Sequence, residues 1–273
     1  MRWKSGMIAM AAAVCLSAPA LRPQNAAVQT KKGTATTTAA NDTFLLIDGV
    51  RQSYDGWHHA AREELQAYMK IHPYDLLAPD RLLYDYIFAT HGPKMDKKEY
   101  EDVLHIADNA IKVFEARGCS GTDLSIAGKS VDCAYVGAAL YASREALLVK
   151  NNGIFHALGA IRRDDRRALH WARRSNFQQA RLLIGINEYE KSKVLFNRRA
   201  EALNEIAAAT NDKTSLFAAD PWFFIYYEEI HHGASWDWFD TRYPHQEIKK
   251  WLERKYPHNG IFHNPDGAYF EAH

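Results

Sequence analysis

KKEYEDVLHIADNAIKVFEAR, residues 97–117, is the stretch that decides the fold class. Its apolar residues recur with the spacing of one face of an α-helix. These residues are Tyr100, Val103, Leu104, Ala107, Ala110, Ile111 and Phe114. Gly118 follows, and glycine is the residue type that most often ends a helix. The spacing therefore predicts an amphipathic helix over residues 97–117.

The same periodicity recurs along most of the chain. It predicts further helices over residues 43–53, 57–70, 77–90, 134–150, 154–174, 178–196, 198–210, 221–232 and 244–255. Strand-like alternation is confined to residues 122–133. We therefore expect an all-α fold with one short loop or hairpin insertion near residues 119–133.

The amino terminus has the features of a secretory signal peptide. Arg2 and Lys4 precede a short apolar run over residues 7–16, and Ala18-Pro19-Ala20 supplies small residues for cleavage. An uncleaved anchor is the alternative. After removal of the signal over residues 1–20, no stretch is apolar enough to span a membrane. We expect an exported protein that is periplasmic or associated with the cell envelope.

The next segment, residues 21–42, is rich in Thr, Ala, Gln and Asn and lacks periodic large apolar residues. Such a segment buries too little surface to offset its ordering entropy. It is predicted to be a disordered tether before a helical domain over residues 43–273.

The overall charge is close to balanced, with 34 Lys and Arg against 33 Asp and Glu. A balance of this kind gives no general attraction to nucleic acid, so no nucleic-acid partner is expected. Hydrophobic residues make up 47% of the chain, which argues against wholesale disorder.

Two cysteines, Cys119 and Cys133, remain after removal of the signal. An even pair in an exported chain, on either side of a Gly-containing loop, suggests a disulfide, and two free thiols are the alternative. The chain contains no CxxC redox pair, no haem-attachment motif and no Cys-rich zinc site.

Small residues and prolines recur at a common interval in two parts of the chain. Pro73 follows Gly49, and Pro257 follows Gly233, at the same spacing. With Leu45, Ala61, Leu65 and Tyr68, the first unit resembles a degenerate tetratricopeptide repeat of secreted bacterial proteins.

The tetratricopeptide resemblance implies antiparallel helix pairs stacked as an α-α superhelix. Its concave groove would hold an extended peptide or a partner's helix. The implied function is a non-enzymatic scaffold that binds an envelope protein or peptide. A small-ligand carrier is a further option.

A cluster of arginines lies on the helix predicted over residues 154–174. At about 100° per residue, Arg162, Arg163, Arg166, Arg167, Arg173 and Arg174 fall inside an arc of about 140°. The cluster could bind an anionic partner, and a solvated face paired with nearby acids is the alternative. The candidate binding residues are Arg162, Arg166, Arg173, Tyr189, Tyr227 and Trp236. Asp165 points into the apolar arc, which predicts a half-buried carboxylate held by a cation or a backbone donor.

Residues 221–240 concentrate aromatic rings beside Glu228, Glu229, His231, Asp237 and Asp240. Paired carboxylates with flanking rings favour an α-helical glycan hydrolase as the alternative function. However, Glu228 and Glu229 are adjacent and point about 100° apart on a helix, and the HExxH spacing is absent. We therefore assign no catalytic residue, no metal ligand and no cofactor.

Overall fold

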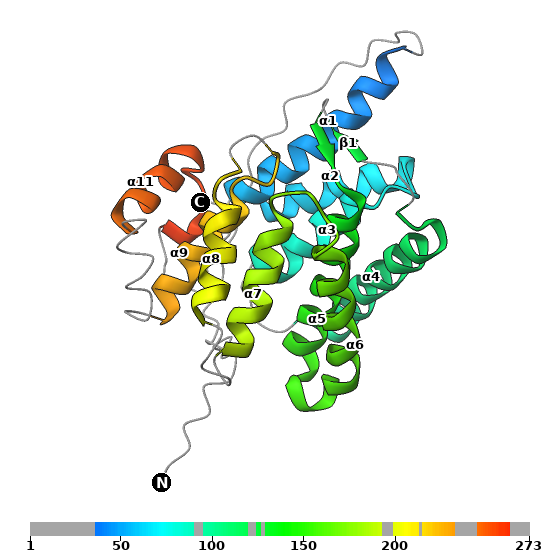
Figure 1. Ribbon diagram of the computed structural model, residues 1–273. Helices are drawn as coiled ribbons and strands as arrows, with labels where there is room; N and C mark the ends of the chain where they lie inside the picture. The colour runs from blue at the N-terminus through cyan, green and yellow to red at the C-terminus, as the bar shows by residue number, and fades with distance from the viewer. Residues whose placement is uncertain are drawn as a thin grey trace.

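The computed structural model describes residues 36–89, 95–119, 124–126, 129–192, 199–212, 215–232 and 245–262. The helices in these ranges are α1 (Thr36–Asp55), α2 (His58–Ile71), α3 (Leu77–Tyr84), α4 (Lys97–Arg117), α5 (Cys133–Asn152), α6 (Ile154–Ala172), α7 (Ala180–Ser192), α8 (Arg199–Ala209), α9 (Asp220–His232) and α11 (His245–Lys255). A π-helical turn, η1 (Asp85–Ala89), continues α3, and a 3-10 turn, η3 (Gly260–Phe262), follows α11. The all-α prediction is confirmed (Figure 1).

The most extensive contacts join helices that follow one another in the chain: α1 with α2, α5 with α6, and α7 with α8. α4 packs on α5, and α3 lies between α2 and α5. One hydrophobic core runs through these helices, with Leu65, Leu82, Phe114 and Phe217 among its fully buried side chains.

The last described helices return to the first ones (Figure 1). The hydroxyl of Tyr54, on α1, donates to Asp220 of α9 over 2.5 Å. The ring of Tyr54 stacks on Phe223, with the centroids 5.8 Å apart. The Asn259 amide donates to the Tyr54 carbonyl over 2.9 Å. The first described helix therefore packs against α9 and against the segment that follows α11.

The largest differences between the described and the predicted helix boundaries lie at two places. α1 begins at Thr36, so residues 36–42 of the predicted tether form its first turns. Extending a helix that packing has already nucleated costs little, since each further residue adds one hydrogen bond. The predicted helix over residues 77–90 becomes π-helical at Asp85. In the described ranges, no helix combines the length and the apolar character needed to cross a membrane.

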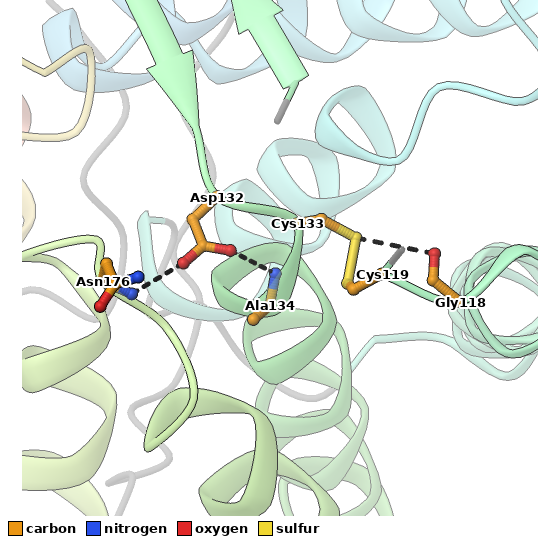
Figure 2. Close-up of a disulfide and its surroundings, with 6 residues drawn as sticks. All are labelled: Gly118, Cys119, Asp132, Cys133, Ala134 and Asn176. Atoms are coloured by element: carbon orange, nitrogen blue, oxygen red, sulfur yellow. Dashed lines mark hydrogen bonds between the residues drawn. A yellow bond between two sulfur atoms is a disulfide. The ribbon is translucent and has the colours of Figure 1, made fainter. Parts of the chain in front are cut away.

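A small hairpin and a disulfide lie between α4 and α5. β1 (Leu124–Ile126) pairs antiparallel with β2 (Lys129–Val131), within the interval where the sequence predicts a hairpin. Cys119 and Cys133 lie at bonding distance, with 5.7 Å between their Cα atoms. Asp132 caps the start of α5 beside them. Its carboxylate accepts hydrogen bonds from the backbone N–H groups of Ala134 and Asn176, each over 2.8 Å (Figure 2). This corner therefore connects α4, α5 and the segment before α7.

Substitution by alanine is expected to change the stability of the fold in opposite directions at two glycines. A Cβ on Gly185 of α7 would lie 2.9 Å from the backbone nitrogen of Ile206 and 3.0 Å from the carbonyl oxygen of Ala202. Both atoms belong to α8 and cannot move alone, so we expect Gly185→Ala to cost about 1–3 kcal/mol. A Cβ on Gly159 of α6 meets open space, so Gly159→Ala should stabilise the fold by about 0.5–1 kcal/mol. Urea unfolding of both variants checks the signs, and equal effects would contradict the close approach of α7 and α8.

Candidate functional site

The buried side of α6 overlaps in part with its predicted apolar arc, which comprises Leu158, Ile161, Ala168, Leu169 and Ala172. Asp164 is 0% exposed, in register with the buried Ala157 and Ala168. Asp165 is partly buried and accepts a hydrogen bond from the Asn187 amide. The close packing of α6 on α5 buries the small residues of this arc, Ala168 and Ala172, and leaves Leu158 exposed.

The buried Asp164 carboxylate is fully used in a structural contact. Arg144 of α5 donates to it from Nε over 2.8 Å and from a terminal nitrogen over 2.6 Å. The third contact of Arg144 is to Asp108 of α4, over 2.8 Å. The hydrogen bond to Asp164 is the main cause that raises the pKa of Arg144. This cluster therefore holds α4, α5 and α6 together.

The exposed side of α6 and the residue that follows it carry a row of side chains, which we call the α6 ridge: Phe155, Leu158, Arg162, Arg166 and Arg173. Phe155 and the three arginines fall within about 40° around the helix axis, and the line is about 27 Å long. Phe155 is 73% exposed and Leu158 is 41% exposed. The ridge therefore places two exposed apolar side chains at one end and cations along the rest.

Arg162 and Arg166, at the centre of the ridge, differ in their pairing from Arg163, Arg167 and Arg173. On the flank, Arg167 pairs with Glu115, and Arg163 lies 3.9 Å from Asp164. On the ridge, Arg173 lies 3.6 Å from Glu188. Among the described residues, Arg162 and Arg166 form no ion pair, although Arg166 donates to the Arg162 carbonyl over 2.9 Å. The alternative prediction, that nearby acids neutralise the arginines, therefore fits Arg163 and Arg167 better than Arg162 and Arg166.

The other candidate binding residues do not join the ridge in the described part of the chain. Tyr189 is 5% exposed and packs in the hydrophobic core. The side chain of Tyr227 and all of Trp236 lie outside the described residues.

The aromatic segment proposed for a hydrolase is described only in its first half. There, Trp222 packs against Trp251, and Tyr226 packs against Phe262, with centroids 5.8 and 5.5 Å apart. The described rings therefore serve helix packing. The side chains of Glu228, Glu229 and His231, and all of Asp237 and Asp240, lie outside the described residues.

A buried ionic network, which we call the closure network, joins α1, α3 and α9. Arg81 donates to Asp80 and to Asp220, each over 3.0 Å, and Tyr54 donates to the other oxygen of Asp220. Burial acts to lower the pKa of Arg81, but the two carboxylates outweigh it and raise that pKa. Burial raises the pKa of Tyr54 and of Asp80. Sequence reasoning missed this network because its members are far apart in the chain.

A second buried network is centred on Asp85, the first residue of the π-helical turn. Ser53 donates to Asp85 over 2.6 Å, His58 Nδ1 lies 2.8 Å from the same oxygen, and Arg62 donates to the other oxygen over 2.7 Å. Burial opposes ionisation of Asp85, but the hydrogen bond from His58 leads the contacts that lower its pKa. In a catalytic Ser-His-Asp triad the serine hydroxyl donates to the histidine ring. Here Ser53 donates to the Asp85 carboxylate instead, so these three contacts do not form a catalytic triad.

Lys150, near the end of α5, is mostly buried beside this second network. Its ammonium group donates to the Tyr86 carbonyl over 3.3 Å, and in the described part of the chain it has no ion-pair partner. Burial is the main cause that lowers the pKa of Lys150 to about 8, and the nearby Arg62 lowers it further. An amine of this kind is partly neutral near physiological pH.

The lowered pKa of Lys150 predicts a pH dependence of stability. In the unfolded chain the amine binds its proton up to about pH 10.5, and in the folded chain up to about pH 8. The unfolded state therefore binds more protons between these values, and stability rises with pH across this window. We expect the free energy of unfolding of the protein, relative to that of Lys150→Met, to rise by about 3 kcal/mol from pH 7.5 to pH 10.5. Urea titrations of both proteins measure this difference in unfolding free energy. If it does not change with pH, the pKa of Lys150 is not lowered in the folded protein.

An open pocket of about 560 Å³, which we call the seam pocket, lies where α1 and α2 meet the end of α11. Its lining includes Arg51, Asp55, Trp57, Lys255 and His258. The rings of Trp57 and His258 lie 5.9 Å apart, centroid to centroid. Burial is the main cause that raises the pKa of Asp55. The pocket therefore combines charges of both signs with a half-exposed indole.

The described residues contain no group of three His, Cys, Asp or Glu side chains placed to hold a metal ion. Comparisons of the chain with protein-family models, with curated proteins and with solved structures found no match.

Proposed function

We propose that this protein is an exported, non-enzymatic binding protein, and that the α6 ridge binds an acidic segment of an envelope protein or peptide. The observation that carries the proposal is the exposed line of Phe155, Leu158, Arg162, Arg166 and Arg173 on one helix face. Residues 154–174 hold six arginines against two aspartates, a net of +4, in a chain whose formal charge is +1.

The chemistry of the ridge suits a carboxylate-bearing partner. Guanidinium groups donate two parallel hydrogen bonds to a carboxylate, and Arg162 and Arg166 have no acid partner in the described chain to displace. Exposed Phe155 and Leu158 offer apolar surface next to these charges, and aromatic residues and arginine are enriched in protein interfaces. An amphipathic acidic helix laid along α6 would satisfy both features.

We further propose that the helix pairs are degenerate tetratricopeptide-like repeats. The position of Gly49 supports this, because a Cβ there would lie 2.9 Å from the Leu65 side chain and 3.3 Å from the Ala61 carbonyl oxygen. A small residue at this point lets α1 and α2 approach closely, as such repeats require. Gly233, in the second proposed unit, lies outside the described residues. The paired cysteines support export through an oxidising compartment.

Photo-cross-linking from the ridge tests the proposed function. A photoreactive residue replaces Gly159, which is exposed and adjoins the ridge, and the adducts form in intact cells of the native host. We expect one discrete protein adduct, reduced about ten-fold or more by Arg162→Glu with Arg166→Glu, because the acidic segment then faces like charges. The adduct should also weaken when the salt concentration of isolated envelopes is raised.

The matched control changes the same net charge elsewhere. Lys98 and Lys112 of α4 are exposed and form no ion pair among the described residues, so Lys98→Glu with Lys112→Glu should leave the adduct unchanged. An adduct that both double variants reduce equally would indicate a response to overall charge. No adduct, or one insensitive to the ridge variant, would overturn the proposal.

The seam pocket favours a second candidate function, a carrier of a small ligand. A concave site between distant parts of a chain is a common place for ligands. The indole of Trp57 can stack on a planar group, and Arg51 or Asp55 can fix a charged one. Trp57→Ala should then abolish saturable binding of the ligand while leaving the α6 adduct intact.

A further inference from the structure

Lys150 is the feature of the described structure that helix packing explains least. Its ammonium group has three N–H donors, and one of them donates a hydrogen bond to the Tyr86 carbonyl. The cost of burying a charge is normally offset by an ion pair, and no carboxylate in the described chain lies within ion-pair distance of Lys150.

The charged and titratable groups that face Lys150 come from three elements. Arg62 on α2 lies over the Tyr86 ring, with its guanidinium carbon 3.8 Å from the centroid, and its charge lowers the pKa of Lys150. Glu99 on α4 raises that pKa slightly and lies 3.9 Å from Arg62. Lys150 thus contacts the carbonyl of Tyr86, and Arg62 contacts the ring of the same residue.

This arrangement meets the two conditions that make a lysine nucleophilic. A lysine amine reacts with carbonyl groups only when it is neutral, and desolvation or a neighbouring cation favours the neutral form. Lys150 has both, because its side chain is mostly buried and Arg62 packs on the ring of Tyr86, the residue whose carbonyl Lys150 contacts. The Arg62 guanidinium has five N–H donors, which exceeds its contacts with Asp85, Glu99 and the Tyr86 hydroxyl, and a guanidinium is the preferred partner of a carboxylate.

We propose that Lys150 is a covalent binding site for a small carbonyl compound that carries a carboxylate, and that Arg62 orients the carboxylate. The lone pair of the Lys150 nitrogen attacks the carbonyl carbon, and the carbonyl oxygen takes up a proton to give a carbinolamine. The nitrogen then loses its remaining proton while the hydroxyl leaves as water, so one C=N bond replaces one C=O bond. The step is a condensation and needs no oxidant or reductant. It goes beyond the proposed function of the α6 ridge and does not depend on it.

Reductive trapping of the full-length protein with glyoxylate tests this proposal. Sodium cyanoborohydride reduces the imine to a stable carboxymethyl amine, and peptide mapping then gives the labelling rate of each lysine. We expect Lys150 to be labelled at least ten-fold faster at pH 7.5 than Lys112, an exposed lysine of α4. The Lys150 rate should rise from pH 7 and level off above about pH 8, whereas that of Lys112 should keep rising.

A neutral aldehyde of similar size, acetaldehyde, separates the roles of the two residues. We expect the preference of Lys150 over Lys112 to fall several-fold with acetaldehyde, because Arg62 then has no carboxylate to bind. Arg62→Gln should remove the preference for glyoxylate while acetaldehyde labelling of Lys150 persists, which also reports that the variant is folded. Equal labelling of Lys150 and Lys112 by glyoxylate in the folded protein would overturn the proposal. Equal preference for both aldehydes would overturn the role of Arg62.

Discussion

Arg81→Met should lower the free energy of unfolding by about 3–5 kcal/mol, which is a large fraction of the stability of a typical domain. The side chain of Arg81 is 4% exposed, and its partners Asp80 and Asp220 are 1% and 3% exposed. Removal of the arginine leaves two buried carboxylates without a cation. Urea unfolding followed by circular dichroism measures the loss.

Two companion variants identify the cause of that loss. Arg117 is exposed and donates to the Tyr74 carbonyl, so Arg117→Met should change stability by less than about 1 kcal/mol. The triple variant Arg81→Met, Asp80→Leu, Asp220→Leu should regain part of the loss, because apolar groups can replace a buried ionic cluster, while the Tyr54 hydroxyl loses its acceptor. A cost of less than about 1 kcal/mol for Arg81→Met alone would contradict this account. It would mean that the carboxylates of Asp80 and Asp220 are solvated and not buried.

The closure network also shows which part of the fold is hidden from sequence reasoning. Helical periodicity is a local property, so the described helices match their predicted residues closely except at the start of α1 and the end of α3. The pairing of Tyr54 with Asp220 joins positions 166 residues apart, and no local pattern predicts this contact. Asp220 reads in the sequence as a helix cap before Pro221, and its buried contact with Arg81 becomes evident only in three dimensions.

The candidate site was predictable in part, for a related reason. The arginines of α6 form a stripe by spacing alone, and the structure leaves Arg162 and Arg166 on its exposed face. The opposite face was predicted in part, because Ala168 and Ala172 are buried whereas Leu158 of the same predicted arc is exposed. Close helix packing instead selects small residues, and it buries Asp164 against Arg144. Lys150 gives no signal in the sequence, since its burial depends on α2 and on the π-helical turn.

Removal of the disulfide between Cys119 and Cys133 has the second large expected effect. In the chain-entropy account, a cross-link that closes a loop of about 15 residues restricts the unfolded chain and stabilises the fold by about 3 kcal/mol. Cys119→Ala with Cys133→Ala should therefore lower the free energy of unfolding by about this amount.

The same double variant should keep the native helical content, because the packing of α5 on α4 does not depend on the sulfur atoms. Phe114 of α4 occupies the space beside Gly137 of α5, and Asp132 still caps α5 through the Ala134 amide. Reductant should lower the melting temperature of the wild-type protein towards that of the double variant and leave the variant itself unchanged. Alkylation before reduction provides the direct check on purified material. Two alkylated thiols in the wild-type protein, or a melting temperature that reductant does not change, would show that the cross-link does not form.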